Sequence, residues 1–213
     1  MKRDWLTQSA LCLVMVISTA HAAVPGTASP ATSPATAPAG SPKDMLLRSD
    51  KAIHEHGLEA ASACYYAAND ADARIAKVLA HGEVAEDAFE SAVRDAFGKV
   101  ASDRAVHAIG DKTTADLMTA DEKIEGDRAT ILFKGDEDPM VLVRVGGEWK
   151  IGIAENRKVW IPSGDDEFIR EQQACAVEFD KLAAEVKAGK FKSADAVCDE
   201  AGRRIDAAVQ PPQ

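Results

Sequence analysis

Two glycine-centred turns in the middle of the chain constrain its fold more than any other feature. Gly126-Asp127 and Gly146-Gly147 each separate two short segments, and three of these four segments, at 128–134, 140–145 and 148–153, are rich in apolar and β-branched residues. A two-residue turn of this composition joins neighbouring antiparallel strands. The pattern therefore predicts a four-stranded antiparallel meander. Its strands are expected at 120–125, 128–134, 140–145 and 148–153.

The second turn also predicts a strand register. A two-residue loop pairs Arg144 with Trp149, Leu142 with Ile151 and Met140 with Ile153. Five of these six residues are apolar and lie on one face, so helices are expected to cover that face. The same register allows the guanidinium of Arg144 to lie against the ring of Trp149.

Helical spacing of apolar residues replaces the strand pattern on both sides of the sheet. Ser41-Pro42 is a helix start signal, and the apolar residues from Leu46 to Leu79 predict one long helix, with a break or a bend at Gly57 and an end at Gly82. Two shorter helices are expected up to 109, and a helical hairpin is expected over 163–210. Segregated helices and strands of this kind indicate an α+β fold.

The first 22 residues have the pattern of a cleaved secretory signal peptide. A basic start is followed by a short apolar run, and Ala20 and Ala22 satisfy the small-x-small rule for signal peptidase. Residues 23–41 consist almost entirely of Ala, Pro, Thr, Ser and Gly, which predicts a disordered linker. The folded part is then a single domain over 42–210, and its expected location is the periplasm or the exterior.

The charge of the chain narrows its partners. The formal charge is −10, and loss of Lys2, Arg3 and Asp4 with the signal peptide would make it −11. An acidic surface disfavours nucleic acid as a partner. No segment after the cleavage site is long and apolar enough to predict a membrane span.

The strand motifs resemble those of the nuclear-transport-factor-2-like (cystatin-like cone) superfamily. The resemblance is carried by GDRATIL at 126–132 and by VLVRVGGEWKI at 141–151, and it covers about 43–155. It implies a curved sheet behind N-terminal helices, forming a cone that holds a small apolar ligand. Many non-catalytic members bind a protein partner or dimerise, so the resemblance also allows a homodimer.

Candidate binding residues follow from the expected sheet face and from the scarce aromatic residues. They are Tyr65, Tyr66, Arg144, Trp149 and Trp160. Isomerase-type members of the superfamily need a Tyr and acidic groups inside the cone, but no catalytic residue is assigned here by motif. The leading hypothesis is therefore an exported, non-catalytic accessory or binding protein with its ligand or partner on the concave sheet face. The alternatives are an enzyme that uses Tyr65 or Tyr66 with a carboxylate, and a purely structural envelope protein.

No metal ligand set and no cofactor motif emerges from the sequence. The histidines of His54-Glu55-His56 are two apart, so on a helix they face different sides, and the acidic runs lack the spacing of a calcium loop. Cys64, Cys175 and Cys198 remain after export, and an oxidising compartment favours one disulfide. Cys64 with Cys175 or Cys198 is the preferred pairing, because Cys175 and Cys198 would be offset by about 12 Å along a tight helical hairpin. Three buried thiols without a disulfide are the alternative.

Overall fold

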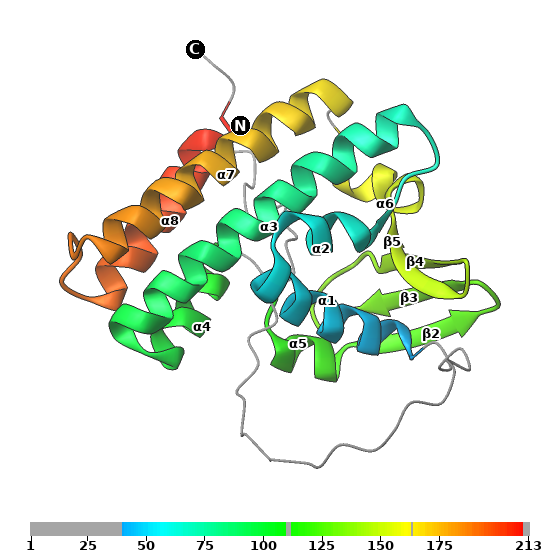
Figure 1. Cartoon of the computed structure of the whole chain (residues 1–213), viewed down its shortest axis with the longest axis horizontal. Helices are drawn as coiled ribbons and strands as arrows, with labels where there is room; N and C mark the ends of the chain where they lie inside the picture. Colours follow the sequence, from blue (N-terminus) through cyan, green and yellow to red (C-terminus); the bar gives the residue numbers. More distant parts are fainter. Residues whose placement is uncertain (1–39, 110–111, 163, 211–213) are drawn as a thin grey trace, which may run out of the picture.

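A computed structural model describes residues 40–109, 112–162 and 164–210. The predicted signal peptide, and the predicted linker up to residue 39, lie outside the described residues. The fold within them is α+β (Figure 1). None of the described helices has both the length and the apolar character needed to cross a bilayer.

The described elements follow one another as helices, a strand, helices, four strands and helices. The helices are α1 (Pro42–His56), α2 (Leu58–Ala63), α3 (Asp70–Phe97), α4 (Lys99–Ala108), α5 (Thr114–Thr119), α6 (Ile153–Trp160), α7 (Asp165–Lys187) and α8 (Ala194–Ala208). The strands are β1 (Tyr65–Tyr66), β2 (Asp121–Glu125), β3 (Arg128–Leu132), β4 (Met140–Val145) and β5 (Glu148–Gly152).

The sheet is mixed and five-stranded, in the order β1-β5-β4-β3-β2. Strands β2 to β5 form the expected antiparallel meander, but β1 adds a short parallel strand beside β5. The prediction of a purely antiparallel four-stranded sheet was therefore wrong. It missed β1 because Tyr65-Tyr66 is too short to produce an alternating pattern of its own.

The register predicted for the β4–β5 hairpin is confirmed near its turn. Arg144 lies opposite Trp149, and Leu142 lies opposite Ile151. The predicted third pair, Met140 with Ile153, does not form, because the chain leaves the sheet after Gly152 and Ile153 begins α6. The guanidinium carbon of Arg144 lies 4.4 Å from the centroid of the Trp149 ring, as the register predicts.

The N-terminal helices divide differently from the prediction. The helix start at Ser41 is confirmed, since its side chain accepts a hydrogen bond from the Asp44 N–H. However, the helix does not continue to Leu79. The chain turns at Gly57, whose φ of 63° suits glycine, and a new helix begins after Asn69 and runs without interruption through Gly82. Burial of flanking apolar residues of α3 offsets the helix cost of one glycine, which is about 1 kcal/mol.

Two hydrophobic cores lie along α3. The sheet core includes Ile75, Leu79, Leu142, Trp149 and Ile151. The helical core is formed where α3 and α4 meet α7 and α8, and Phe89 and Phe179 pack there with ring centroids 5.8 Å apart. The sheet face predicted to be covered by helices is thus filled by core side chains.

The two C-terminal helices occur near their predicted positions but do not form a separate hairpin. Helix α7 lies along α3, and α8 packs against α4 as well as against α7 (Figure 1). The reason is that α7 carries a continuous apolar stripe, including Phe179 and Leu182, that needs a long partner. Helix α3 is long enough to bury most of that stripe, and the shorter α8 is not.

Candidate functional site

A cavity of about 790 Å³ lies between α1, α2 and the β4–β5 hairpin. Its size is within the range of sites that hold small molecules. Helix α1 contributes four of the lining residues, α2 and its C-cap contribute three, and the hairpin contributes its turn and the start of β5. The lining residues are Gly40, Met45, Arg48, Ser49, Ala52, Ala60, Ala63, Cys64, Gly146, Gly147, Glu148, Trp149 and Lys150.

Small residues keep this space open. Ala60 and Ala63 are the α2 residues that face the cavity, and Ala52 faces it from α1. Gly57 separates the two helices with a backbone conformation that other residues rarely adopt, so α2 turns away from the axis of α1. Trp149 and Met45 supply the larger apolar surfaces of the wall.

The charged groups of the lining give the cavity a positive excess. Among the described residues, Arg48 and Lys150 are its cations, and Glu148 is its one carboxylate. Within the described part of the chain, neither Arg48 nor Lys150 forms an ion pair. Two cations beside an apolar wall suit a ligand that combines an anionic group with an apolar body.

Cys64 is the lining residue with the most strongly perturbed chemistry. Burial raises the pKa of its thiol to about 11, and the negative charge of Glu83 contributes in the same direction. The thiol is therefore protonated at neutral pH and is a poor nucleophile.

A hydrogen-bonded tyrosine and carboxylate lie behind the cavity. The hydroxyl of Tyr65 donates to Glu83 Oε1 over 2.6 Å, and both residues are buried. Neither residue lines the cavity. Tyr65 and Tyr66 were expected on a helix, but they form β1, where alternate side chains face opposite sides of the sheet.

Of the predicted binding residues, Trp149 alone lines the cavity. Arg144 covers the ring of Trp149 and is otherwise exposed. Trp160 is buried in the sheet core, and Tyr66 is half-buried beside Gly152. The sequence reasoning missed Arg48, Ser49 and Lys150, because their relevance depends on how α1 packs against β5.

Three buried glutamates on α3 were also missed. Glu83, Glu86 and Glu90 are spaced three and four residues apart, so they share one face of the helix. Glu90 accepts a hydrogen bond from the Ser102 hydroxyl over 2.9 Å and lies 3.4 Å from the Arg94 guanidinium. No group of His, Cys, Asp or Glu in the described ranges has the arrangement of a metal site.

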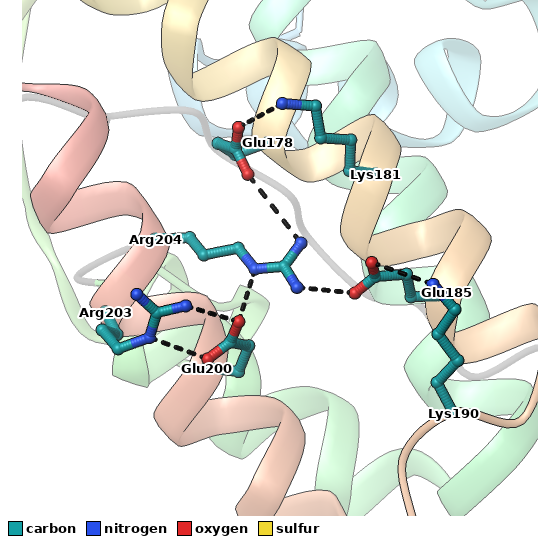
Figure 2. Close-up of polar contacts among 7 residues, drawn as sticks. All are labelled: Glu178, Lys181, Glu185, Lys190, Glu200, Arg203 and Arg204. Carbon is teal, nitrogen blue, oxygen red and sulfur yellow. Dashed lines mark hydrogen bonds and ion pairs between the residues drawn. The ribbon is translucent and has the colours of Figure 1, made fainter.

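A second polar cluster links α7 to α8 on the surface. Figure 2 shows Arg204 between the two helices, with Glu200 on its own helix and Glu185 on α7. The Arg204 guanidinium lies 2.6 Å from a Glu200 oxygen and 2.7 Å from a Glu185 oxygen. Arg203 also binds Glu200, but it does not reach α7. This cluster fixes the packing of the two helices, and its residues are not among the described residues that line the cavity.

Acid is expected to weaken this cluster. Hydrogen bonds from Arg203 and Arg204 lower the pKa of Glu200 from 4.5 to about 2. Because the folded-state pKa is depressed, the stabilisation is complete above the unfolded pKa and is lost as pH falls toward the folded value. We expect Arg204→Gln to lower the melting temperature at about pH 6, with the difference from wild type vanishing toward about pH 2.

Thermal melts at several pH values measure this effect, and Arg203→Gln is the matched control. This substitution removes the same charge, and the side chain that it removes contacts the same glutamate, Glu200. It breaks no contact between α7 and α8, because Arg203 and Glu200 both lie on α8. A smaller loss for Arg203→Gln is expected. Equal losses for both variants at all pH values would contradict the linking role of Arg204.

The three cysteines are buried and form no disulfide within the described residues. Cys64 lies in the sheet core, whereas Cys175 and Cys198 lie in the helical core. The preferred pairing of Cys64 with one of the other two is therefore absent from the structure, which shows the alternative of three buried thiols. The sequence placed all three on apolar stripes but did not show that these stripes enter different cores.

No family model matches the chain, and comparisons with curated proteins and with solved structures give no significant match either.

Proposed function

We propose that this chain is an exported, non-catalytic binding protein that holds a small amphipathic anion in the cavity between α1, α2 and β5. The observation that carries the proposal is the composition of the lining. Met45 and Trp149 provide apolar surface, and Arg48 and Lys150 provide positive charge that no described residue neutralises by an ion pair. The nuclear-transport-factor-2-like resemblance is compatible with such a role, since members of that superfamily hold small ligands.

An enzyme is the weaker alternative. It would use the hydrogen-bonded pair of Tyr65 and Glu83, which is the combination of a tyrosine and a carboxylate considered above. A catalytic group has to reach the reacting atoms of its substrate. The Tyr65–Glu83 pair does not line the cavity, and Cys64, which does, has its pKa raised to about 11. These observations favour binding over chemistry.

Titration calorimetry with decanoate tests the proposed ligand class. Decanoate carries a carboxylate and an apolar chain, and decanol is the matched neutral probe. We expect decanoate to bind more tightly than decanol, and Arg48→Gln to weaken decanoate binding by about tenfold, which corresponds to 1.4 kcal/mol. Ala52→Leu should weaken both probes, because it places a larger side chain in the cavity.

Arg74→Gln is the control, because Arg74 is exposed and pairs with Asp166 on α7 rather than facing the cavity. It should leave decanoate binding unchanged. Equal affinity for decanol and decanoate would contradict the role of the cations. Absence of binding by every amphipathic anion tested would contradict the proposed function.

Export is tested by the mature N-terminus. We expect signal peptidase to cleave between Ala22 and Ala23, because the small-x-small pair there directly follows the apolar run. N-terminal sequencing of protein isolated from outside the cytoplasm should begin at Ala23. A chain that retains Met1 would contradict the proposed location.

A further inference from the structure

The outer edge of β5 is only partly covered. Strand β1 pairs with Ile151 and Gly152, but β5 begins earlier, at Glu148. The chain before β1 does not continue alongside β5, because residues 58–63 form α2. Within the described part of the chain, the first half of β5 therefore has no neighbouring strand on this side, and the cavity lies there.

The direction of the backbone groups on this edge follows from two hydrogen bonds. The Ile151 N–H donates to the Cys64 carbonyl over 2.8 Å, so the backbone of Ile151 points away from β4. Residues two apart on a strand point the same way, so the Trp149 N–H and C=O also face outward. The Arg144 N–H supports this assignment, because it donates to Asp127, on the side of β3.

Strand β1 cannot satisfy these groups of Trp149. The next bond of the parallel ladder would need the Cys64 N–H, which instead donates to the Ala61 carbonyl over 3.1 Å. No described residue forms a backbone hydrogen bond with Trp149 on this edge. The indole Nε1 of Trp149 is also buried without a hydrogen-bond partner in the described residues. The backbone N–H and C=O of Trp149 therefore face the cavity, where an added strand could form hydrogen bonds with both.

We infer that the ligand of this cavity is an extended peptide with a free carboxylate, which pairs with Trp149 and prolongs the sheet where β1 ends. The inference rests on the proposed binding function and specifies its ligand. A peptide offers both an N–H and a C=O to the edge of β5, whereas a fatty acid offers no backbone donor for the Trp149 carbonyl. Its carboxylate is complementary to Arg48 and Lys150, and its apolar side chains fit beside Met45 and Ala52.

The test uses the peptide Ac-Ala-Val-Ala-Leu-Ala with a free carboxylate, and three altered forms. One form carries a C-terminal amide, one is N-methylated at Val and Leu, and one is N-methylated at the alanines. Alternate residues of a strand direct their N–H groups to opposite edges. We therefore expect one methylation pattern to weaken binding by about tenfold or more and the other to weaken it much less.

Amide hydrogen exchange followed by NMR gives a second, independent readout. Binding of the unmodified peptide should slow the exchange of the Trp149 N–H by about tenfold or more, whereas decanoate should not. Arg48→Gln should weaken the free-acid peptide but not the amide form. That difference separates recognition of the carboxylate from a general loss of stability.

The outcomes separate this inference from the proposed function. If decanoate binds and the peptide does not, the peptide inference is overturned and the binding function stands. Equal effects of the two methylation patterns would also overturn it, because a paired strand has two different edges. Slow exchange of the Trp149 N–H in the absence of peptide would mean that part of this chain, or a second copy of it, already covers this edge of β5. That result would also overturn the peptide inference. If neither decanoate nor the peptide binds, both the binding function and the peptide inference fail.

Discussion

Trp149→Ala is expected to lower the free energy of unfolding by about 3–5 kcal/mol. The Trp149 side chain is 4% exposed and packs in the sheet core with Leu142 and Ile151. Its removal would leave a large void in β5, next to the existing cavity. Urea denaturation followed by circular dichroism measures the loss, and the free energy should fall without a change of the folded spectrum.

Arg144→Ala is the matched control for Trp149. It removes the guanidinium that lies on the indole ring but leaves the indole buried. The expected loss is about 0.5–1 kcal/mol, which is typical of an exposed cation–π contact. A loss for Trp149→Ala as small as that for Arg144→Ala would contradict the packing of the indole in the core.

Asn156→Ala is expected to cost about 3–5 kcal/mol, although it removes only a small side chain. Asn156 is buried, and its amide makes three hydrogen bonds. Its oxygen accepts from the Val141 N–H over 2.8 Å, and its nitrogen donates to the carbonyls of Val141 and Gly152 over 2.8 and 2.7 Å. Alanine would leave three backbone groups without a partner where β4 and β5 separate, and each such group costs about 1–3 kcal/mol.

Two substitutions control for this effect. Asn156→Asp retains an acceptor for the Val141 N–H but cannot donate to the two carbonyls when ionised, so its loss should remain large at neutral pH and decrease in acid. Lys158→Ala changes an exposed residue of the same helix and should have almost no effect. Equal melting curves for Asn156→Ala and wild type would contradict the role of this amide.

The elements that could be predicted are those whose signals are local. Each hairpin has a two-residue glycine turn between its strands, so β2 to β5 appear at almost the predicted positions. Ser41 and Ser193 each precede a helix and accept a hydrogen bond from its first turn, as helix caps do. Such contacts span only a few residues, so the sequence alone contains them.

The two errors in the N-terminal half have different causes, one a local signal that was missed and the other a contact between distant segments. Asn69 followed by Asp70 and Asp72 is a helix start signal, and it could have placed the beginning of α3 correctly. Gly82 was given too much weight as a helix end. A glycine inside a helix costs about 1 kcal/mol, and the packing of α3 against α7 offsets this cost. The two helices are far apart in the sequence, so a short segment around Gly82 cannot reveal this packing.

The cavity is the feature that the sequence predicted least. Trp149 was identified because strand register is a local property, but Arg48 and Lys150 stand in no motif. They share a wall only because α1 packs near β5 and because α2 leaves the first half of β5 without a neighbour. Tyr66 and Trp160 were chosen as candidates because they are aromatic, which can be read from the sequence. Their degree of burial cannot: Trp160 is buried and Tyr66 is half-buried.

The sequence by itself determined the α+β class, the two hairpins, the register beside the Gly146-Gly147 turn and the helix caps at Ser41 and Ser193, because all of these depend on periodicity or on contacts between near neighbours. Only the tertiary structure decided that β1 joins the sheet, that α7 lies along α3 and that the three cysteines enter two different cores. These arrangements depend on which apolar surfaces bury one another across long stretches of chain. Such burial is non-directional and leaves no mark at a fixed spacing in the sequence.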